Sequence, residues 1–594
     1  QRATCRFVQV AMAAMAAVAM LWLLPLVAGT RTSARTWRPS SPGFVFPEEE
    51  QEWSEALAQH LGGKDFGIAL AGGGTRGMAL GHGILRSLRE TGLLEKAKYL
   101  SVTSGSVWLG IPFYYQTLDS LEDYLGSTLK PEQMLPQEVV KETGTGISRI
   151  SYLSEYPKGF PGNGSRRLGE RGVSQTRSIF ECPEDEGWCA CMVSRFPGDG
   201  HALWPLFMAY IFLHPFDLAG HDSTHCHESQ LERMRAKFGK SKTIYTAKDV
   251  SRKLPFLLSQ SAILDPYTGL EPKDPLKFFP LEQTPLYTGT VTAYPKNKTG
   301  MLHDIGDVLV ESFAWDSAMV SAWNANETNQ DLALDLSRGY LNAGDLAEWS
   351  GIATAYIADF QIREWADRIP RCLIAEGEKL LPQAKLWSPM EVDKASIPVT
   401  YEEAVGDAGV YDDLGHIPLL RRGISKMAII TSEAIHLNLC EMTYVLAAFG
   451  QPGCLNPPNP PGASNPKMKP GILTVFEPNE FAAFWSQVQS AIKRNESAVI
   501  RGSYSVVDNE HLGIKGGWKA NIVWVLIFPS KTFRESLPSE TSALLPWYFP
   551  NDFASEMRTH FEMGVASQYA SWLTQRSVTK EISDMLGGVE EVII

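Results

Sequence analysis

The chain lacks an excess of positive charge. It has 54 Lys and Arg residues against 67 Asp and Glu residues, which gives a formal net charge of −13 at pH 7. A protein of that sign is repelled by nucleic acid and is not attracted electrostatically to anionic membranes. We therefore expect no nucleic-acid partner, and any contact with a membrane surface has to be hydrophobic.

Internal repeats, a coiled-coil pattern and a retention signal at the carboxyl end are also missing. The chain does contain a hydrophobic fraction of 44% over 594 residues, which is enough for a large core. Its motifs lie far apart in the sequence. This spacing favours one large α/β domain with insertions.

The first motif is a run of glycines. Residues 71–77 read Ala-Gly-Gly-Gly-Thr-Arg-Gly, between a predicted buried strand, 66–71, and a predicted helix, 75–90. Consecutive glycines allow positive φ and close approach to a ligand, and N–H groups at the amino end of the helix attract negative charge. Such a turn can hold a phosphate or an acyl oxyanion. The alternative is that the glycines only form a tight turn.

The second motif places a serine after the next predicted strand, 99–103. Ser104 stands in Val-Thr-Ser-Gly-Ser-Val-Trp, where the strand turns sharply into a helix and exposes the hydroxyl. In a right-handed strand-helix-strand unit both turns open at one edge of the sheet, so Ser104 neighbours the glycines. The usual elbow, Gly-x-Ser-x-Gly, is absent because Val102 and Ser106 occupy its outer positions. A Ser-His-Asp hydrolase is therefore disfavoured.

Together the two motifs resemble the cytosolic phospholipase A2 and fungal phospholipase B (lysophospholipase) family, with the patatin-like lipases as more distant relatives. The shared features are Gly-Gly-Gly-x-Arg, a helix, a Gly-Leu-Leu turn and Ser-Gly-Ser-x-Trp. The resemblance implies an α/β fold, the patatin-like/cytosolic phospholipase A2 three-layer sandwich with a large cap insertion. It also implies a Ser-Asp dyad that works without histidine.

The family's catalytic Asp usually stands in Asp-x-Gly before an Asn/Leu-Pro-Leu stretch. Asp407-Ala408-Gly409 fits this pattern, since Ile-Pro-Leu-Leu follows at 417–420. Asp412 and Asp413 lie close by, and an acid before glycine is also common in turns. A third, weaker match is Thr-Pro-Leu-Tyr-Thr at 284–288, similar to a family segment that lines the catalytic domain.

The resemblance assigns a role to each candidate residue. Asp407 would be the general base for the nucleophile Ser104, and the N–H groups of Gly73 and Gly74 would stabilise the oxyanion. Arg76 would contact the substrate phosphate, unless it is an exposed residue at the helix start that pairs with a nearby acid. No metal or other cofactor is implied. No calcium-dependent C2 domain precedes the core, so calcium targeting is not implied either.

The chain divides into three expected parts. Residues 1–29 are apolar after two arginines and form a membrane anchor or a cleaved signal peptide. Residues 30–60 are expected to be a linker, and within it the stretch 30–42, rich in Ser, Thr and Arg and free of acids, is alternatively an organelle address. Residues 61–594 are expected to be the catalytic domain, with a cap insertion at approximately 118–283. Inside that insertion, the apolar segment 202–213 is a buried core segment or an interfacial lid.

We expect the protein to be membrane-anchored or secreted, in the lumen of the secretory pathway or outside the cell. Four sequons support a luminal location, at Asn163, Asn297, Asn326 and Asn495. Four cysteines gather in the expected insertion, at positions 182, 189, 191 and 226, and in such a compartment disulfides are the first interpretation. Zinc is the alternative, because His221, His225 and His227 flank Cys226.

Three functions remain open from the sequence. The first is hydrolysis of fatty acyl esters in glycerophospholipids or lysophospholipids through an acyl-enzyme. The second is acyl transfer, or hydrolysis of neutral lipid esters, on the same fold. The third is lipid binding without catalysis. None of them implies an obligate protein partner.

Overall fold

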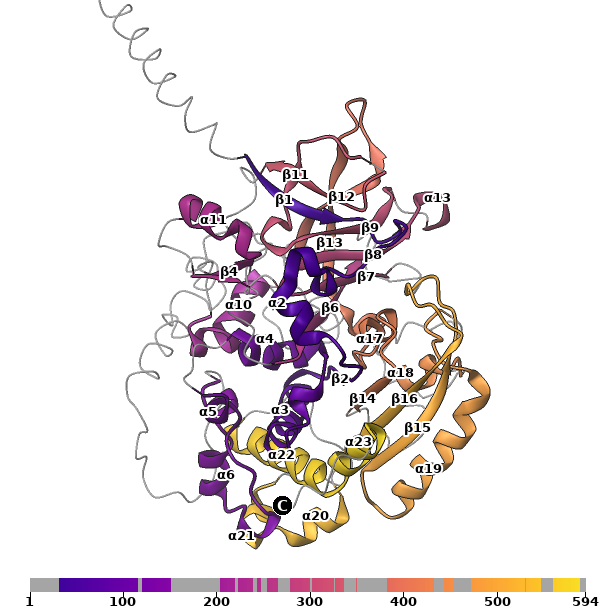
Figure 1. Ribbon diagram of the computed structural model, residues 1–594. Coiled ribbons are helices and arrows are strands. Elements are labelled where there is room, and N and C mark those ends of the chain that lie inside the picture. The colour runs from indigo at the N-terminus through magenta and orange to yellow at the C-terminus, as the bar shows by residue number, and fades with distance from the viewer. Residues whose placement is uncertain are drawn as a thin grey trace, which may run out of the picture.

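The computed structural model has a mixed α/β fold built on one large sheet (Figure 1). The structure describes residues 31–115, 120–150, 203–218, 223–238, 243–246, 254–264, 278–299, 302–324, 326–335, 349, 382–431, 443–451, 472–528, 530–545 and 559–587. The α/β class predicted from the sequence is confirmed.

Over these residues the main sheet has 14 strands. Twelve follow one another in the order β10 (Ala318–Met319), β11 (Asn329–Asp335), β1 (Arg31–Trp37), β9 (Ile305–Glu311), β8 (Tyr287–Tyr294), β7 (Phe278–Gln283), β6 (Phe256–Leu264), β3 (Tyr99–Thr103), β2 (Gly67–Leu70), β14 (Lys426–Thr431), β16 (Trp518–Leu526) and β15 (Ala498–Val506). Beside this row, β13 (Pro398–Asp407) pairs with β6 and with β12 (Gln383–Val392). The run from β6 to β16 is parallel and the flanks are antiparallel.

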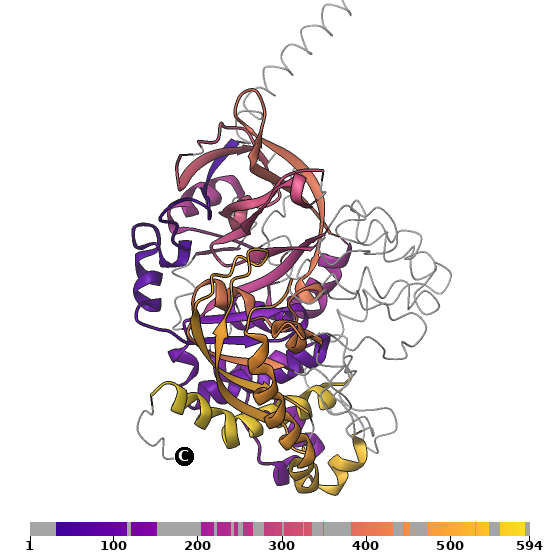
Figure 2. The same ribbon diagram turned by 90° about the vertical axis from the view of Figure 1, so that its right-hand side faces the viewer.

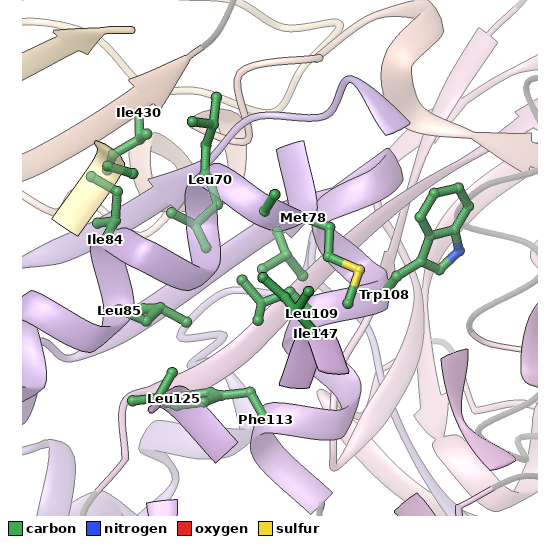
Figure 3. Close-up of a cluster of buried hydrophobic side chains, with 14 of the residues drawn as sticks. Leu70, Met78, Ile84, Leu85, Trp108, Leu109, Phe113, Leu125, Ile147 and Ile430 are labelled. Atoms are coloured by element: carbon green, nitrogen blue, oxygen red, sulfur yellow. The ribbon is translucent and has the colours of Figure 1, made fainter. Parts of the chain in front are cut away.

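Helices cover both faces of the parallel part of the sheet. One apolar core includes residues of α3 (Gly74–Glu90), α4 (Val107–Tyr115) and α22 (His560–Leu573), as Figure 3 shows for α3 and α4. The other core includes residues of α2 (Gln51–Leu61), α17 (Ile417–Arg421), α18 (Thr443–Ala448) and α19 (Phe481–Lys493). Figure 2 shows the molecule turned by 90°. A helix-sheet-helix sandwich results, because the strands between the two cores are buried on both faces.

The remaining helices are short or lie around this sandwich. They are α5 (Leu121–Leu125), α6 (Pro136–Glu142), α7 (Thr145–Ser148), α10 (Leu203–Phe212), α11 (Leu231–Phe238), α13 (Lys296–Thr299), α20 (Lys531–Ser536), α21 (Ser539–Leu544) and α23 (Thr579–Met585). Two more strands, β4 (Ser223–Cys226) and β5 (Thr243–Thr246), form a small sheet of their own.

The predicted strand-helix-strand unit is confirmed as β2, α3 and β3. The two strands are parallel, with Gly67 opposite Tyr99. All four residues of β2 and all five of β3 are buried, which explains why the unit is apolar without alternation. The carboxyl ends of both strands therefore reach the same edge of the sheet.

The segment 30–60 is not a linker over the residues described. Residues 31–37 form β1, which pairs along its length with β11, almost 300 positions away. Residues 51–61 form α2, and both Trp37 and Leu61 are 1% exposed. The strand partner of β1 lies too far along the chain for local sequence to reveal it.

The end of the expected cap insertion, approximately 118–283, also belongs to the sheet. Strands β6 and β7 lie within that range, and β6 pairs with β3 in the middle of the fold. The described residues before β6 form α5, α6, α7, α10, α11 and the small sheet. A cap would therefore have to lie between α4 and β6.

Helix α10 (Leu203–Phe212) forms within the apolar segment 202–213 and packs in the core. Met208 and Phe212 are buried, and the Phe212 ring stacks on Trp108 with ring centroids 4.2 Å apart. The core interpretation is thus favoured over the lid for the side chains described. Within the described part of the chain, no helix is long and apolar enough to span a membrane. Residues 1–29 and the sequon at Asn163 lie outside the described residues, and the other three sequon asparagines are exposed.

A buried ion cluster joins the amino-terminal segment to the sheet. Arg422 donates to Glu48 over 2.8 Å and to Glu282 over 3.1 Å, and all three side chains are fully buried. Burial acts to raise the pKa of Glu282, but the charge of Arg422 lowers this pKa below its usual value. Tyr287 also donates to Glu282, over 2.8 Å. The Thr-Pro-Leu-Tyr segment is thus a buried turn that ends in this cluster.

Replacing Arg422 with Ala should destabilise the protein strongly, because Glu48 would stay buried without its cation and Glu282 would keep only Arg421, 3.6 Å away. Removal of one partner from a buried pair typically costs about 3–5 kcal/mol. We expect a clear fall in the thermal midpoint by calorimetry. Arg501→Ala is the control, since that side chain is 42% exposed beside Glu581 and should change little. Equal thermal midpoints for the two variants would contradict the stabilising role of Arg422 in the buried ion cluster.

Candidate active site

Ser104 sits at a sharp turn between β3 and α4. It is one of the few non-glycine residues described with positive φ, 50°, and it begins a single 3₁₀ turn, Ser104–Ser106, before the helix. Non-glycine residues adopt this backbone conformation only when their surroundings hold them in it. The sharp turn predicted at Ser104 is present.

The hydroxyl of Ser106 holds this turn. Ser106 Oγ accepts from the Thr103 N–H over 2.9 Å and lies 2.9 Å from the Leu70 carbonyl oxygen, to which it donates. It therefore ties the elbow to the strand that feeds the glycine turn. Val102, at the other position where a glycine is usual, is fully buried with its methyl groups facing Gly110 of α4. The departures from Gly-x-Ser-x-Gly thus have local packing reasons.

The glycine turn packs directly against the elbow. Gly73 has φ 102° and Gly74 has φ 62°, and α3 begins at Gly74. A Cβ added to Gly105 would lie 2.1 Å from the Gly74 oxygen, and one added to Gly72 would lie 2.6 Å from Ser104 Cβ. Only glycine allows this approach. The first turn of α3, whose N–H groups lack partners within the helix, is therefore next to the serine.

Asp407, at the end of β13, contacts Ser104. Ser104 Oγ donates to Asp407 Oδ2 over 2.6 Å, and the Gly409 N–H donates to Oδ1 over 2.7 Å. The carboxyl is 3% exposed. Burial raises its pKa to about 7, against the opposing effect of the hydrogen bonds from Ser104 and Gly409. A carboxylate with that pKa is suited to accept and return a proton near neutral pH.

The register of β6 brings these two residues together. Thr103 of β3 lies opposite Gln260, while Asp407 of β13 lies opposite Ser261, the next residue of β6. One strand runs parallel to β6 and the other antiparallel, so their carboxyl ends meet at this point. The dyad geometry follows from two strand pairings on a shared neighbour.

Asp412, one of the alternatives to Asp407, has a structural role instead. Its carboxylate accepts backbone N–H groups of residues 414, 415 and 417, the Gln260 amide over 2.7 Å and His416 Nδ1 over 2.9 Å. Burial acts to raise the pKa of Asp412, but His416 and these donors lower this pKa below its usual value. A carboxylate that is fully buried and bonded in this way is not placed to take a proton from Ser104.

The backbone of the same segment secures both motifs. The Asp412 carbonyl accepts the Thr103 hydroxyl over 3.0 Å, and the Asp413 carbonyl accepts the Gly72 N–H over 2.9 Å. Sequence reasoning missed these roles, as well as that of Ser106. The i,i+4 spacing of Asp412 and His416 is a sequence signal from which their local pair could have been predicted.

The other predicted site residues lie as follows. Arg76 is half-buried in the first turn of α3, two residues after Gly74. No histidine is among the described contacts of Ser104 and Asp407. Cys226 is buried, while the other cysteines and His221 lie outside the described residues. Within the described part, no three potential ligands gather as a metal site would require.

Residues 66–140, which contain both motifs, match the family model described as the lysophospholipase catalytic domain. This match confirms the family resemblance. The matched segment runs from Phe66, just before β2, through the elbow into α6. Asp407 lies outside it. No curated protein sequence matches the chain.

Solved structures that resemble the chain include human GIVD cytosolic phospholipase A2, with a TM-score of 0.42, 14% identity and coverage of 91% of this chain and 64% of that one. The same human protein in complex with methyl gamma-linolenyl fluorophosphonate gives a TM-score of 0.39 at 14% identity, with coverage of 91% of this chain and 63% of that one. The chain thus spans less than two thirds of the length of these structures. At this identity and these TM-scores, no conclusion about function follows from the similarity.

The reactivity of Ser104 should depend on pH. Asp407 accepts a proton only when it is ionised, and its pKa is about 7, so reactivity should fall as the pH drops below 7 and level off above it. The measurement is the labelling rate with a fluorophosphonate probe between pH 5 and 9, with Ser104→Ala as the unlabelled control. A rate that is flat over this range would contradict the role of Asp407.

Proposed function

We propose that the protein is a serine hydrolase that cleaves fatty acyl esters of glycerophospholipids or lysophospholipids. The observation that carries this proposal is the 2.6 Å hydrogen bond from Ser104 Oγ to Asp407 Oδ2, next to the glycine turn. The lysophospholipase match over residues 66–140 supports a lipid ester as substrate.

The reaction follows from these positions. Asp407 takes the Ser104 proton as the oxygen attacks the ester carbonyl, and the N–H groups of Gly73 and Gly74 stabilise the tetrahedral oxyanion. Such a donor typically contributes about 3 kcal/mol. Asp407 then returns the proton to the leaving alcohol, which leaves an acyl-enzyme on Ser104. Water, activated by the same carboxylate, releases the fatty acid and restores the serine.

Arg76 supplies the contact that distinguishes a phospholipid from a neutral ester. Its guanidinium, in the first turn of α3, is two residues from the oxyanion glycines. A planar fork of donors suits a phosphate, and such a ligand would explain a cation at a helix end that disfavours cations. The substrate phosphate would lie over this turn while the ester lies over Ser104.

Ser104→Ala and Asp407→Asn should each abolish release of fatty acid from phosphatidylcholine and lysophosphatidylcholine vesicles. The first variant removes the nucleophile, and the second removes the base while keeping the shape of the side chain. The purified full chain is assayed with both variants, and circular dichroism checks that they fold. Activity retained by Asp407→Asn would show that the base is misassigned. No release by the unaltered protein would reject the phospholipase proposal and favour neutral esters, acyl transfer or binding alone.

Arg76→Ala should lower kcat/KM for lysophosphatidylcholine by about tenfold to a hundredfold, as expected for loss of a charge-assisted hydrogen bond. Hydrolysis of 4-nitrophenyl butyrate, which has no phosphate, should change little. Arg76→Lys keeps the charge without the fork. Its kcat/KM for lysophosphatidylcholine should therefore lie between those of the unaltered protein and of Arg76→Ala. An equal loss on both substrates would mean that Arg76 supports the fold of α3 and does not bind phosphate.

A further inference from the structure

A chain of hydrogen bonds runs from α18 to the nucleophile. The Tyr444 hydroxyl donates to the Gly409 carbonyl, and the Gly409 N–H donates to Asp407 Oδ1 over 2.7 Å. Asp407 Oδ2 in turn accepts the Ser104 hydroxyl over 2.6 Å. Tyr444 therefore reaches the dyad through one glycine of the Asp-x-Gly turn.

The Gly409 N–H matters because Asp407 has few donors. The carboxyl is buried, and its described donors are Ser104 and Gly409. A hydrogen bond to the ionised form favours that form, and its strength depends on alignment. If the turn loosens, the carboxylate loses alignment toward the serine and part of its stabilisation. The orientation of Gly409 thus affects both the position and the protonation of the base.

The turn is held from two sides. Ala408 is fully buried, and the Tyr411 hydroxyl donates to the Ser261 carbonyl over 3.0 Å, which fixes the turn to β6. On the other side, α18 is anchored in the second core by Val445 and Leu446, at 0% and 1% exposure. Tyr444 itself is half-buried, and its hydroxyl connects this anchored helix to the turn.

We propose that Tyr444 is a positioning residue for the catalytic base, which it orients by holding the carbonyl of Gly409. The proposal rests on the Ser104-Asp407 dyad of the proposed function. It gives α18, which none of the sequence motifs includes, a role in the reaction.

Tyr444→Phe tests this, because it removes the hydroxyl and keeps the ring. We expect kcat to fall about threefold to tenfold with KM little changed, as for loss of one positioning hydrogen bond. We also expect the acid limb of the pH profile to move upward by roughly half a unit, because the ionised base loses stabilisation. Other titratable groups beside the turn are Tyr411, Asp412 and Asp413, and all stay unchanged.

Tyr294→Phe is the matched control. That tyrosine is buried, whereas Tyr444 is half-buried, and the Tyr294 hydroxyl likewise donates to a backbone carbonyl, that of His511, outside the site. Both variants lose the same kind of bond, so a purely structural role predicts similar losses of thermal stability and unmoved pH profiles. A moved acid limb in Tyr444→Phe alone supports the proposal. An unmoved limb, or equal movement in both variants, overturns it.

The readout separates this inference from the proposed substrate. Fluorophosphonate labelling of the full chain reports how strongly Asp407 activates Ser104, whichever ester is the natural substrate. If no lipid is hydrolysed but labelling of Tyr444→Phe shows the shifted acid limb, the phospholipase proposal fails and the positioning role stands. If lipid is hydrolysed and the limb is unmoved, the positioning role fails alone.

Discussion

The pairing of β3 and β13 with consecutive residues of β6 is the constraint on which the site depends. Ser104 and Asp407 are 303 positions apart, and their hydroxyl-carboxylate hydrogen bond exists because Gln260 and Ser261 fix where the two strands end. Since the side-chain period of a strand is two, a slip of one residue would turn Asp407 to the opposite face. The register is secured by the buried residues of all three strands.

Close backbone contact around the elbow adds the second layer of precision. The glycine turn, the serine turn and residues 412–413 are held by hydrogen bonds of about 3 Å, several of them between backbone atoms. At Gly72 and Gly105 even a methyl group would collide with a neighbour. Such packing leaves the glycine turn and Ser104, the proposed oxyanion donors and nucleophile, little freedom relative to each other. Preorganisation of this kind is what makes electrostatic stabilisation of a transition state effective.

The three acids of the segment 407–413 show how environment divides similar residues into different roles. Asp407 has two donors and a pKa of about 7, as a base for acyl transfer requires. Asp412 has five donors and remains ionised, so it holds backbone in place. Asp413 contributes its carbonyl to the glycine turn. The residue type alone could not assign these roles, because hydrogen-bond count and burial decide them.

The sequence by itself determined the local unit of the site. A buried strand, three glycines, a helix, a second strand and Ser-Gly-Ser are contiguous, and their geometry follows from φ preferences and from the handedness of strand-helix-strand units. The match of Asp-x-Gly to a family pattern selected Asp407. Only the tertiary structure showed that Asp407 reaches the serine, that residues 31–61 join the fold, and that Tyr444 holds the turn. Each of these rests on contacts between residues far apart in the chain, which no local pattern encodes.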